Sequence, residues 1–237
     1  MTINKNNVRV CYLCNQPLDG ELNVDHVPPR QFYAKAIRKS HNPNLLTLRV
    51  HKRCNQQYQH DEDYFVNTLI PLAHDTYTVN SVLRDNVEKY RNRQQVGLMQ
   101  KVLREFDSRP SGLILPHGKV AKRLDGQRVH RIAWKIVRGL YFYHEGKVFP
   151  EATSRNLQIV SPGERPPDVF FALDKSPNLG TYPGVFDHRY AQFPEVHNMY
   201  FWAILLWDRL ILLMAFHDPS EDQIPGKDND REACIPT

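Results

Sequence analysis

Two short pairs of metal-ligand residues stand in the N-terminal quarter of the chain, Cys11-x-x-Cys14 and His51-x-x-Cys54. A structural zinc ion takes four sulfur or nitrogen ligands in a tetrahedron, and two tight turns with this spacing supply them. A segment of this size buries too little apolar surface to fold without such a cross-link. The sequence therefore predicts one structural Zn²⁺ bound by these four residues.

The residues between and beside these pairs include side chains suited to phosphodiester hydrolysis. Asp25 and His26 are adjacent, and Asn55 directly follows Cys54. Carboxylate and amide oxygens are ligands for Mg²⁺, and an imidazole can take a proton from water near neutral pH. Metal-assisted attack of water on a phosphodiester needs these groups.

The order of the motifs resembles the HNH endonucleases, whose core is the ββα-metal fold. The resemblance covers roughly residues 9 to 66, and it rests on five segments: Cys11-x-x-Cys14, DHVPPR from Asp25 to Arg30, Asn44-Leu45, HKRCN from His51 to Asn55, and DEDYF from Asp61 to Phe65. Two positions depart from the family pattern. His51 stands where the family usually has a third zinc cysteine. Tyr58 stands where many relatives carry lysine, so His60 or Lys52 would have to replace that phosphate contact.

The resemblance implies a role for each polar residue. Asp25 and Asn55 would hold a catalytic Mg²⁺ or Mn²⁺. His26, on the opposite strand face from Asp25, would be the general base on the attacking water. Asn44 matches the middle asparagine of the family, which fixes the loop and orients the histidine. We therefore expect His26, Asp25, Asn44 and Asn55 to be the catalytic residues.

Other interpretations of the same residues stay open. Asp25 could simply cap a turn, and the zinc segment would then be a nucleic-acid-binding module without turnover. An RNase on the same core is a further alternative, because the chemistry does not inspect the 2′-hydroxyl. The acidic run Asp61-Glu62-Asp63 is most simply a charged helix face. A role in phage defence or in a mobile element follows by family analogy alone.

Positive charge is concentrated on the motif segment. Residues 1–60 contain nine lysines and arginines against three acids, whereas residues 218–237 contain two basic residues and six acids. A phosphate-backbone binder needs such an excess, although a solvated surface explains it as well. The expected partner is DNA, with RNA as the alternative. The predicted nucleic-acid contacts are Arg30, Lys35, Arg38, Lys52, Arg53, Arg131 and Lys135.

The sequence predicts a cytoplasmic protein with no membrane contact. The chain has 237 residues and four cysteines, three of them in the metal-ligand pairs, so a disulfide framework is not expected. The first ten residues are polar and do not resemble a signal peptide. The apolar run 200–216 is interrupted by Asp208-Arg209, which leaves each half too short to cross a bilayer.

Hydrophobic patterns predict an α+β chain in which the N-terminal zinc-stabilised ββα-metal module is followed by long helices and a C-terminal antiparallel β-sheet. The predicted helices are 31–38, 55–73, 81–106 and 119–143. The predicted strands are 8–10, 22–24, 45–50, 157–160, 169–173, 185–193, 199–206 and 210–216. We expect the late strands to pack on helix 119–143, although the last two could form one buried helix instead.

These elements divide the chain into three parts. Residues 1–75 form the HNH nuclease module, residues 76–218 form a helical plus β domain of unknown role, and residues 219–237 form an acidic, disordered tail. The middle part is large enough to be a specificity or sensing domain, and it could carry an oligomer contact or a protein partner.

Overall fold

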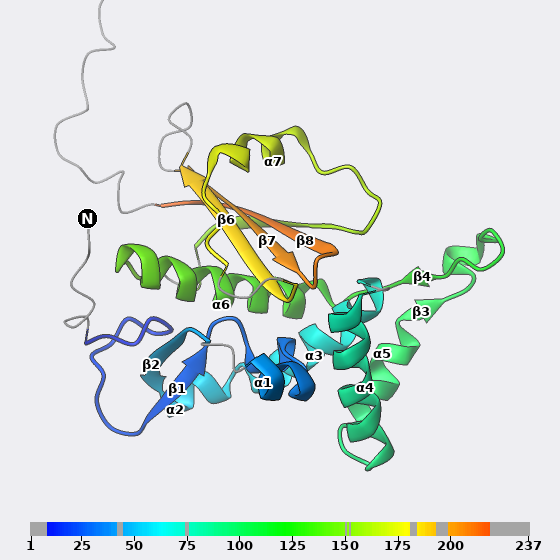
Figure 1. Ribbon diagram of the computed structural model, residues 1–237, viewed down its shortest axis with the longest axis horizontal. Helices are drawn as coiled ribbons and strands as arrows, with labels where there is room; N and C mark the ends of the chain where they lie inside the picture. The colour runs from blue at the N-terminus through cyan, green and yellow to red at the C-terminus, as the bar shows by residue number, and fades with distance from the viewer. Residues whose placement is uncertain are drawn as a thin grey trace, which may run out of the picture.

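The computed structural model describes residues 9–41, 45–73, 76–149, 151, 153–180, 184–192 and 199–218. The predicted α+β class is confirmed. Figure 1 shows the long helix α6 (Gly126–Glu145) lying between a four-stranded sheet on one side and the N-terminal strands and short helices on the other. The predicted strand 8–10 is described only from residue 9, where Val10 bridges Pro17. The predicted tail 219–237 and Asn44 lie outside the described residues.

The N-terminal elements follow the predicted β-β-α order. Strand β1 (Leu22–His26) pairs antiparallel with β2 (Thr47–His51), and Asp25 is opposite Leu48. The connection between them contains η1 (Arg30–Phe32) and α1 (Lys35–His41), which replace the single helical turn predicted at 31–38. The predicted helix 55–73 is divided into α2 (Lys52–Gln56), α3 (Gln59–Leu69) and η2 (Ile70–Leu72).

The predicted helix 81–106 is two helices, α4 (Tyr77–Arg91) and α5 (Val96–Arg104). The chain breaks between them where Arg93 and Gln95 take positive φ angles of 58° and 55°, which a helix does not accommodate. A projecting hairpin arm follows, built from β3 (Phe106–Asp107), η3 (Pro110–Gly112) and β4 (Ala121–Lys122). Figure 1 shows this arm extending away from the rest of the molecule.

Helix α6 starts at Gly126, later than the predicted residue 119. The Asp125 carboxylate accepts a hydrogen bond from the Arg128 amide and so caps the first turn, while residues 121–122 belong to the hairpin arm. The helix ends at Glu145, and Gly146 directly after it takes the left-handed conformation with φ of 72°.

The C-terminal sheet has the strand order β5-β8-β7-β6, and every neighbouring pair is antiparallel. Its strands are β5 (Arg155–Val160), β6 (Phe186–Gln192), β7 (Met199–Leu206) and β8 (Leu210–His217). Strands β7 and β8 form a hairpin, which excludes the alternative of one buried helix. Aromatic rings join α6 to the sheet, as predicted: Trp134 is 5.0 Å from Phe216, and Tyr141 is 5.2 Å from Tyr200, between ring centroids.

The predicted strand 169–173 is wrong. This segment forms helix α7 (Asp168–Ala172) and the turn η4 (Leu173–Lys175). Phe170 and Leu173 pack on the sheet, whereas Val169 and Phe171 are exposed. That three-residue spacing suits a helix, and Pro167 directly before it starts the turn.

One hydrophobic core connects the predicted 1–75 module with α6 and the sheet. The Tyr12 ring lies 6.1 Å from the Phe142 ring, and the Trp207 indole donates a hydrogen bond of 3.1 Å to the Phe32 carbonyl oxygen. The N-terminal segment is therefore packed against residues more than a hundred positions away. No helix among the described residues is long and apolar enough to cross a lipid bilayer.

Gly139 marks the point where α6 crosses the end of β1. A Cβ atom at this position would lie 2.8 Å from a Val27 methyl carbon. We expect Gly139→Ala to lower the free energy of unfolding by about 1–3 kcal/mol, because the gain in helix propensity is smaller than the cost of overpacking. Gly97→Ala on α5, where nothing lies within 4 Å, is the control and should stabilise slightly. Urea unfolding compares the two, and equal effects would contradict the close approach.

Candidate metal centre and the adjoining cleft

Cys11, Cys14, His51 and Cys54 lie close together and could hold a zinc ion. One ligand atom from each lies within 4.8 Å of all the others. The His51 Nδ1 atom is 3.3 Å from the Cys14 sulfur and 4.0 Å from the Cys54 sulfur. The four residues come from the turn at 11–15, the end of β2 and helix α2, so a shared metal ion would tie three segments together.

A tight turn brings the first two cysteines together. The amides of Cys14 and Asn15 both donate to the Cys11 carbonyl oxygen, at 3.2 and 2.7 Å. Asn15 takes a positive φ of 57°, a conformation that asparagine tolerates better than most residues. The chain then returns, and the Cys11 amide donates to the Gln16 carbonyl oxygen at 2.8 Å. These bonds hold the two sulfur atoms on one side of the turn.

The His51 ring is oriented for metal binding by its other nitrogen. Its Nε2 atom is 2.9 Å from the Pro17 carbonyl oxygen, which accepts a hydrogen bond only if Nε2 carries the proton. The lone pair is then on Nδ1, the nitrogen that faces the cysteine sulfurs. Histidine ligands of zinc commonly donate their other ring N–H to a backbone carbonyl, which fixes the tautomer.

An open cleft of about 350 Å³ lies next to this cluster. Asp25 and His26 at the end of β1 line it, together with Asn55 from α2. Three of the four predicted catalytic residues are therefore brought to one cleft, and Asn44 lies outside the described residues. His60 and Glu62 from the start of α3 also line it, as does Arg30.

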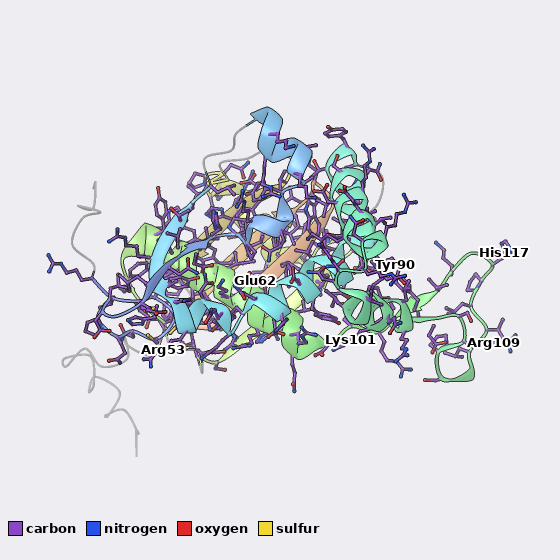
Figure 2. All side chains as sticks on the ribbon, turned by 90° about the horizontal axis from the view of Figure 1, so that it is seen from below. Arg53, Glu62, Tyr90, Lys101, Arg109 and His117 are labelled. Atoms are coloured by element: carbon purple, nitrogen blue, oxygen red, sulfur yellow. The ribbon has the colours of Figure 1, made fainter. Side chains whose placement is uncertain are left out.

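The Lys135 ammonium group lies among the carboxyl and amide oxygens beneath this cleft. Its Nζ is 2.8 Å from Asp25 Oδ1 and 3.4 Å from Asn55 Oδ1, and it also contacts Glu62 Oε1. Lys135 is only 2% exposed. Lys135, a predicted nucleic-acid contact, is therefore buried and does not lie on the surface. Figure 2 shows Glu62 near the middle of the molecule, on α3.

Tyr12 provides a hydrogen-bond donor for the second carboxylate oxygen of Asp25. Its hydroxyl donates a hydrogen bond to Asp25 Oδ2, and both side chains are buried. Burial, and then the neighbouring Asp25 charge, raise the pKa of Tyr12 well above its ordinary value, so the phenol remains a donor. Asp25 is thus held on one side by a neutral hydroxyl and on the other by an ammonium group.

Burial and the neighbouring charges shift the pKa of two further residues. Burial raises the pKa of Glu62, and the Lys135 ammonium opposes this change. Burial, followed by the positive charge of Arg30, lowers the pKa of His26, although Asp25 acts in the other direction. His26 is therefore a neutral imidazole at neutral pH, as a general base must be.

Three of the other six predicted nucleic-acid contacts, Lys35, Lys52 and Arg131, already have acidic partners. Arg131 donates to Asp61 at 2.8 Å and to Glu151 at 3.2 Å. Lys52 lies 3.0 Å from Glu21, and Lys35 lies 3.4 Å from Glu88. Arg38 is half-buried, whereas Arg30 and Arg53 are exposed. On α6, Arg131 and Arg128 thus share one acid of α3, Asp61.

Three residues around Asp25 were not expected there: Tyr12 and Lys135, which contact its carboxylate, and Glu62, which contacts Lys135. Glu62 belongs to the acidic run that the sequence favoured as a charged helix face. Lys135 stands between Trp134 and Ile136 in an otherwise apolar run. A lysine in such a run indicates that its side chain is buried and paired with an acid.

Searches with this chain against protein-family models, curated proteins and solved structures found no match.

Proposed function

We propose that this chain is a metal-dependent endonuclease of the HNH type that hydrolyses phosphodiester bonds in DNA. One observation carries the proposal. Asp25 Oδ1 and Asn55 Oδ1 converge on a single positive charge, in a cleft that His26 lines and that adjoins the Cys/His cluster. A site that gathers oxygen atoms around one cation has the donor chemistry that Mg²⁺ or Mn²⁺ needs.

Each residue of the cleft has a task in this proposal. Asp25 and Asn55 would hold the divalent ion, which when bound would supply the charge that stabilises the phosphorane-like transition state and the leaving oxygen. His26 would accept the proton of the attacking water on its free imidazole nitrogen. Arg30, exposed at the same cleft, would bind a phosphate oxygen of the substrate and position it. The zinc cluster would hold the Asn55 end of the site in place.

A second candidate function has its own supporting observation. The Lys135 ammonium already neutralises Asp25 and contacts Asn55. This arrangement suits a zinc-stabilised module that binds nucleic acid without cleaving it.

The two candidate functions differ in whether the protein cleaves its nucleic acid. Labelled duplex DNA, single-stranded DNA and RNA of one sequence are incubated with the zinc-loaded full chain and Mn²⁺, and binding is measured in parallel. Cleavage of the duplex supports the nuclease, whereas binding that leaves all three intact supports the module.

The hairpin arm supports a nucleic-acid partner. Residues 106–124 contain four basic residues and one acid, Asp107. Arg109 and Lys119 are exposed, and Ile114 is 90% exposed. Figure 2 shows Arg109 and His117 at the far end of the arm. A projecting arm with positive charge and apolar residues can follow a groove of a duplex.

Neutralising the arm is expected to weaken DNA binding. Arg109→Gln with Lys119→Gln should reduce the affinity about tenfold and lower the slope of log affinity against log salt by about 2, because two phosphate contacts are lost. Lys175→Gln, at an exposed lysine in η4 beside the sheet, is the control and should change neither quantity. Fluorescence anisotropy across a salt series measures both, and an unchanged slope in the double variant would exclude the arm from the interface.

A further inference from the structure

We infer that Lys135 occupies the catalytic-cation position of the cleft in the metal-free chain, so that a divalent ion binds Asp25 and Asn55 only when the ammonium group moves away. Lys135 would then be a positioning residue that sets the metal affinity of the site. The inference rests on the proposed function for the location of the metal, but the competition it describes does not depend on turnover.

The geometry places the ammonium group at the point that a metal would share. Its nitrogen lies 2.8 Å from Asp25 Oδ1 and 3.4 Å from Asn55 Oδ1, the two atoms proposed as metal ligands, and it also contacts Glu62 Oε1. Mg²⁺ needs its oxygen ligands at about 2.0–2.1 Å in an octahedron. A divalent ion bound to these same oxygens would lie within a few ångströms of the ammonium charge, where like charges repel strongly.

The rest of the cluster leaves Asp25 with little freedom to turn toward another cation. Its Oδ2 atom accepts the Tyr12 hydroxyl, so Oδ1 is the oxygen that remains for a cation. Tyr12 in turn is attached to α6, because Arg138 Nη2 donates to the carbonyl oxygens of Tyr12 and Leu13 at 2.9 and 2.8 Å. The carboxylate and the helix that carries Lys135 are therefore held in one frame, and the flexible part is the lysine side chain.

The charges show why the site can exchange one cation for another. The single ammonium group of Lys135 is shared between two carboxyl groups, those of Asp25 and Glu62. The Tyr58 ring lies below Lys135, with Nζ 5.2 Å from its centroid. An aromatic face at this distance attracts an ammonium group. It gives Lys135 a second favourable position when a divalent ion binds the oxygens of Asp25 and Asn55.

Binding of Mn²⁺ alone, without substrate, tests this competition. The zinc-loaded full chain is titrated with Mn²⁺, and free Mn²⁺ is measured by electron paramagnetic resonance. We expect Lys135→Met to bind one Mn²⁺ about tenfold or more tightly than the wild type, because the binding-competent state no longer requires displacement of the lysine. Unchanged or weaker Mn²⁺ binding by Lys135→Met, or no binding by either protein, would overturn the inference.

Lys122→Met is the matched control. Lys122 is also a buried lysine paired with a glutamate, since its Nζ lies 2.7 Å from Glu105 Oε2 with side-chain exposures of 5% and 8%. Its replacement creates the same kind of defect at the base of the hairpin arm. We expect Mn²⁺ affinity in Lys122→Met to equal that of the wild type. An equal gain in both variants would mean that destabilisation, and not the vacated position, causes tighter binding.

A measurement on the wild type covers the case in which Lys135→Met does not fold. The wild type is acylated briefly with an amine reagent in the presence and absence of Mn²⁺, and peptides are quantified by mass spectrometry. Mn²⁺ should increase the labelling of Lys135 severalfold, while that of Lys122 stays constant. Lys135 labelling that does not respond to saturating Mn²⁺ would overturn the inference. If the competition is found but neither DNA nor RNA is cleaved, the inference holds and the proposed function fails.

Discussion

Replacement of His26 by alanine is expected to reduce DNA cleavage by about 10²–10⁴-fold, the usual contribution of a general base. His26 lines the cleft beside Asp25 and Asn55, and burial together with Arg30 keeps its imidazole neutral by lowering its pKa. A general base accelerates the chemical step and adds little to the binding of the ground state. DNA affinity, measured by anisotropy with Ca²⁺ in place of Mg²⁺, should therefore remain within about twofold of the wild type.

His130→Ala provides the control for this prediction. His130 lies on α6, does not line the cleft, and is partly buried like His26. Its replacement should leave the cleavage rate unchanged. A His26→Ala protein that cuts DNA at the wild-type rate would show that another group removes the proton, and the assignment of the general base would be wrong.

Loss of one zinc ligand is expected to have the largest effect on stability. Structural zinc contributes about 10–16 kcal/mol of apparent binding free energy in small zinc modules, and that binding energy is folding energy. Cys14→Ser should therefore lower the zinc content from about one ion per chain to near zero and reduce the free energy of unfolding by at least about 3 kcal/mol. The expected cause is the separation of the turn at 11–15 from β2 and α2.

Loss of zinc in Cys14→Ser should also disturb the cleft around Asp25. Arg138 on α6 donates to the carbonyl oxygens of Tyr12 and Leu13, which lie between the two cysteines of the turn. When the turn loosens, Tyr12 can no longer hold Asp25, and cleavage should be lost together with zinc. Plasma mass spectrometry and thermal unfolding measure the two quantities. Cys234→Ser, at the cysteine that is not among the four predicted zinc ligands, is the control. A wild type that folds stably without zinc would contradict the assignment.

The features that could be predicted from the sequence depend on residues that are close together in the chain. The two-residue spacing in Cys11-x-x-Cys14 and His51-x-x-Cys54 already identifies a set of four ligand atoms, and the structure brings them within 4.8 Å of one another. The hairpin β7–β8 and its packing on α6 follow from apolar runs separated by the turn at Asp208-Arg209. The hairpin was confirmed because the apolar pattern determines it. The proximity of the four ligand atoms was also confirmed, while zinc binding itself stays a prediction.

The surroundings of Asp25 depend instead on contacts between distant residues. Lys135 lies 110 positions from Asp25 and 73 from Glu62, and no local pattern indicates which helix will cross the end of β1. The register of α6 decides that Lys135 points toward Asp25 and Glu62 and that Arg138 points toward the turn at 11–15. The segment 169–173 was predicted as a strand because a short apolar run does not distinguish periods of two and three to four residues. Its packing on the sheet made it helical.

The central claim is hydrolysis of DNA at the Asp25/His26/Asn55 cleft, and a plasmid assay tests it most directly. The zinc-loaded full chain is incubated with supercoiled plasmid over a series of Mn²⁺ concentrations, beside Asp25→Ala protein that retains its zinc. The account predicts that the wild type converts the plasmid to nicked or linear DNA at a rate that rises with Mn²⁺ and saturates, while Asp25→Ala leaves it supercoiled. A folded, zinc-loaded wild type that leaves the plasmid supercoiled at every Mn²⁺ concentration, or an Asp25→Ala protein that cuts equally fast, would contradict it.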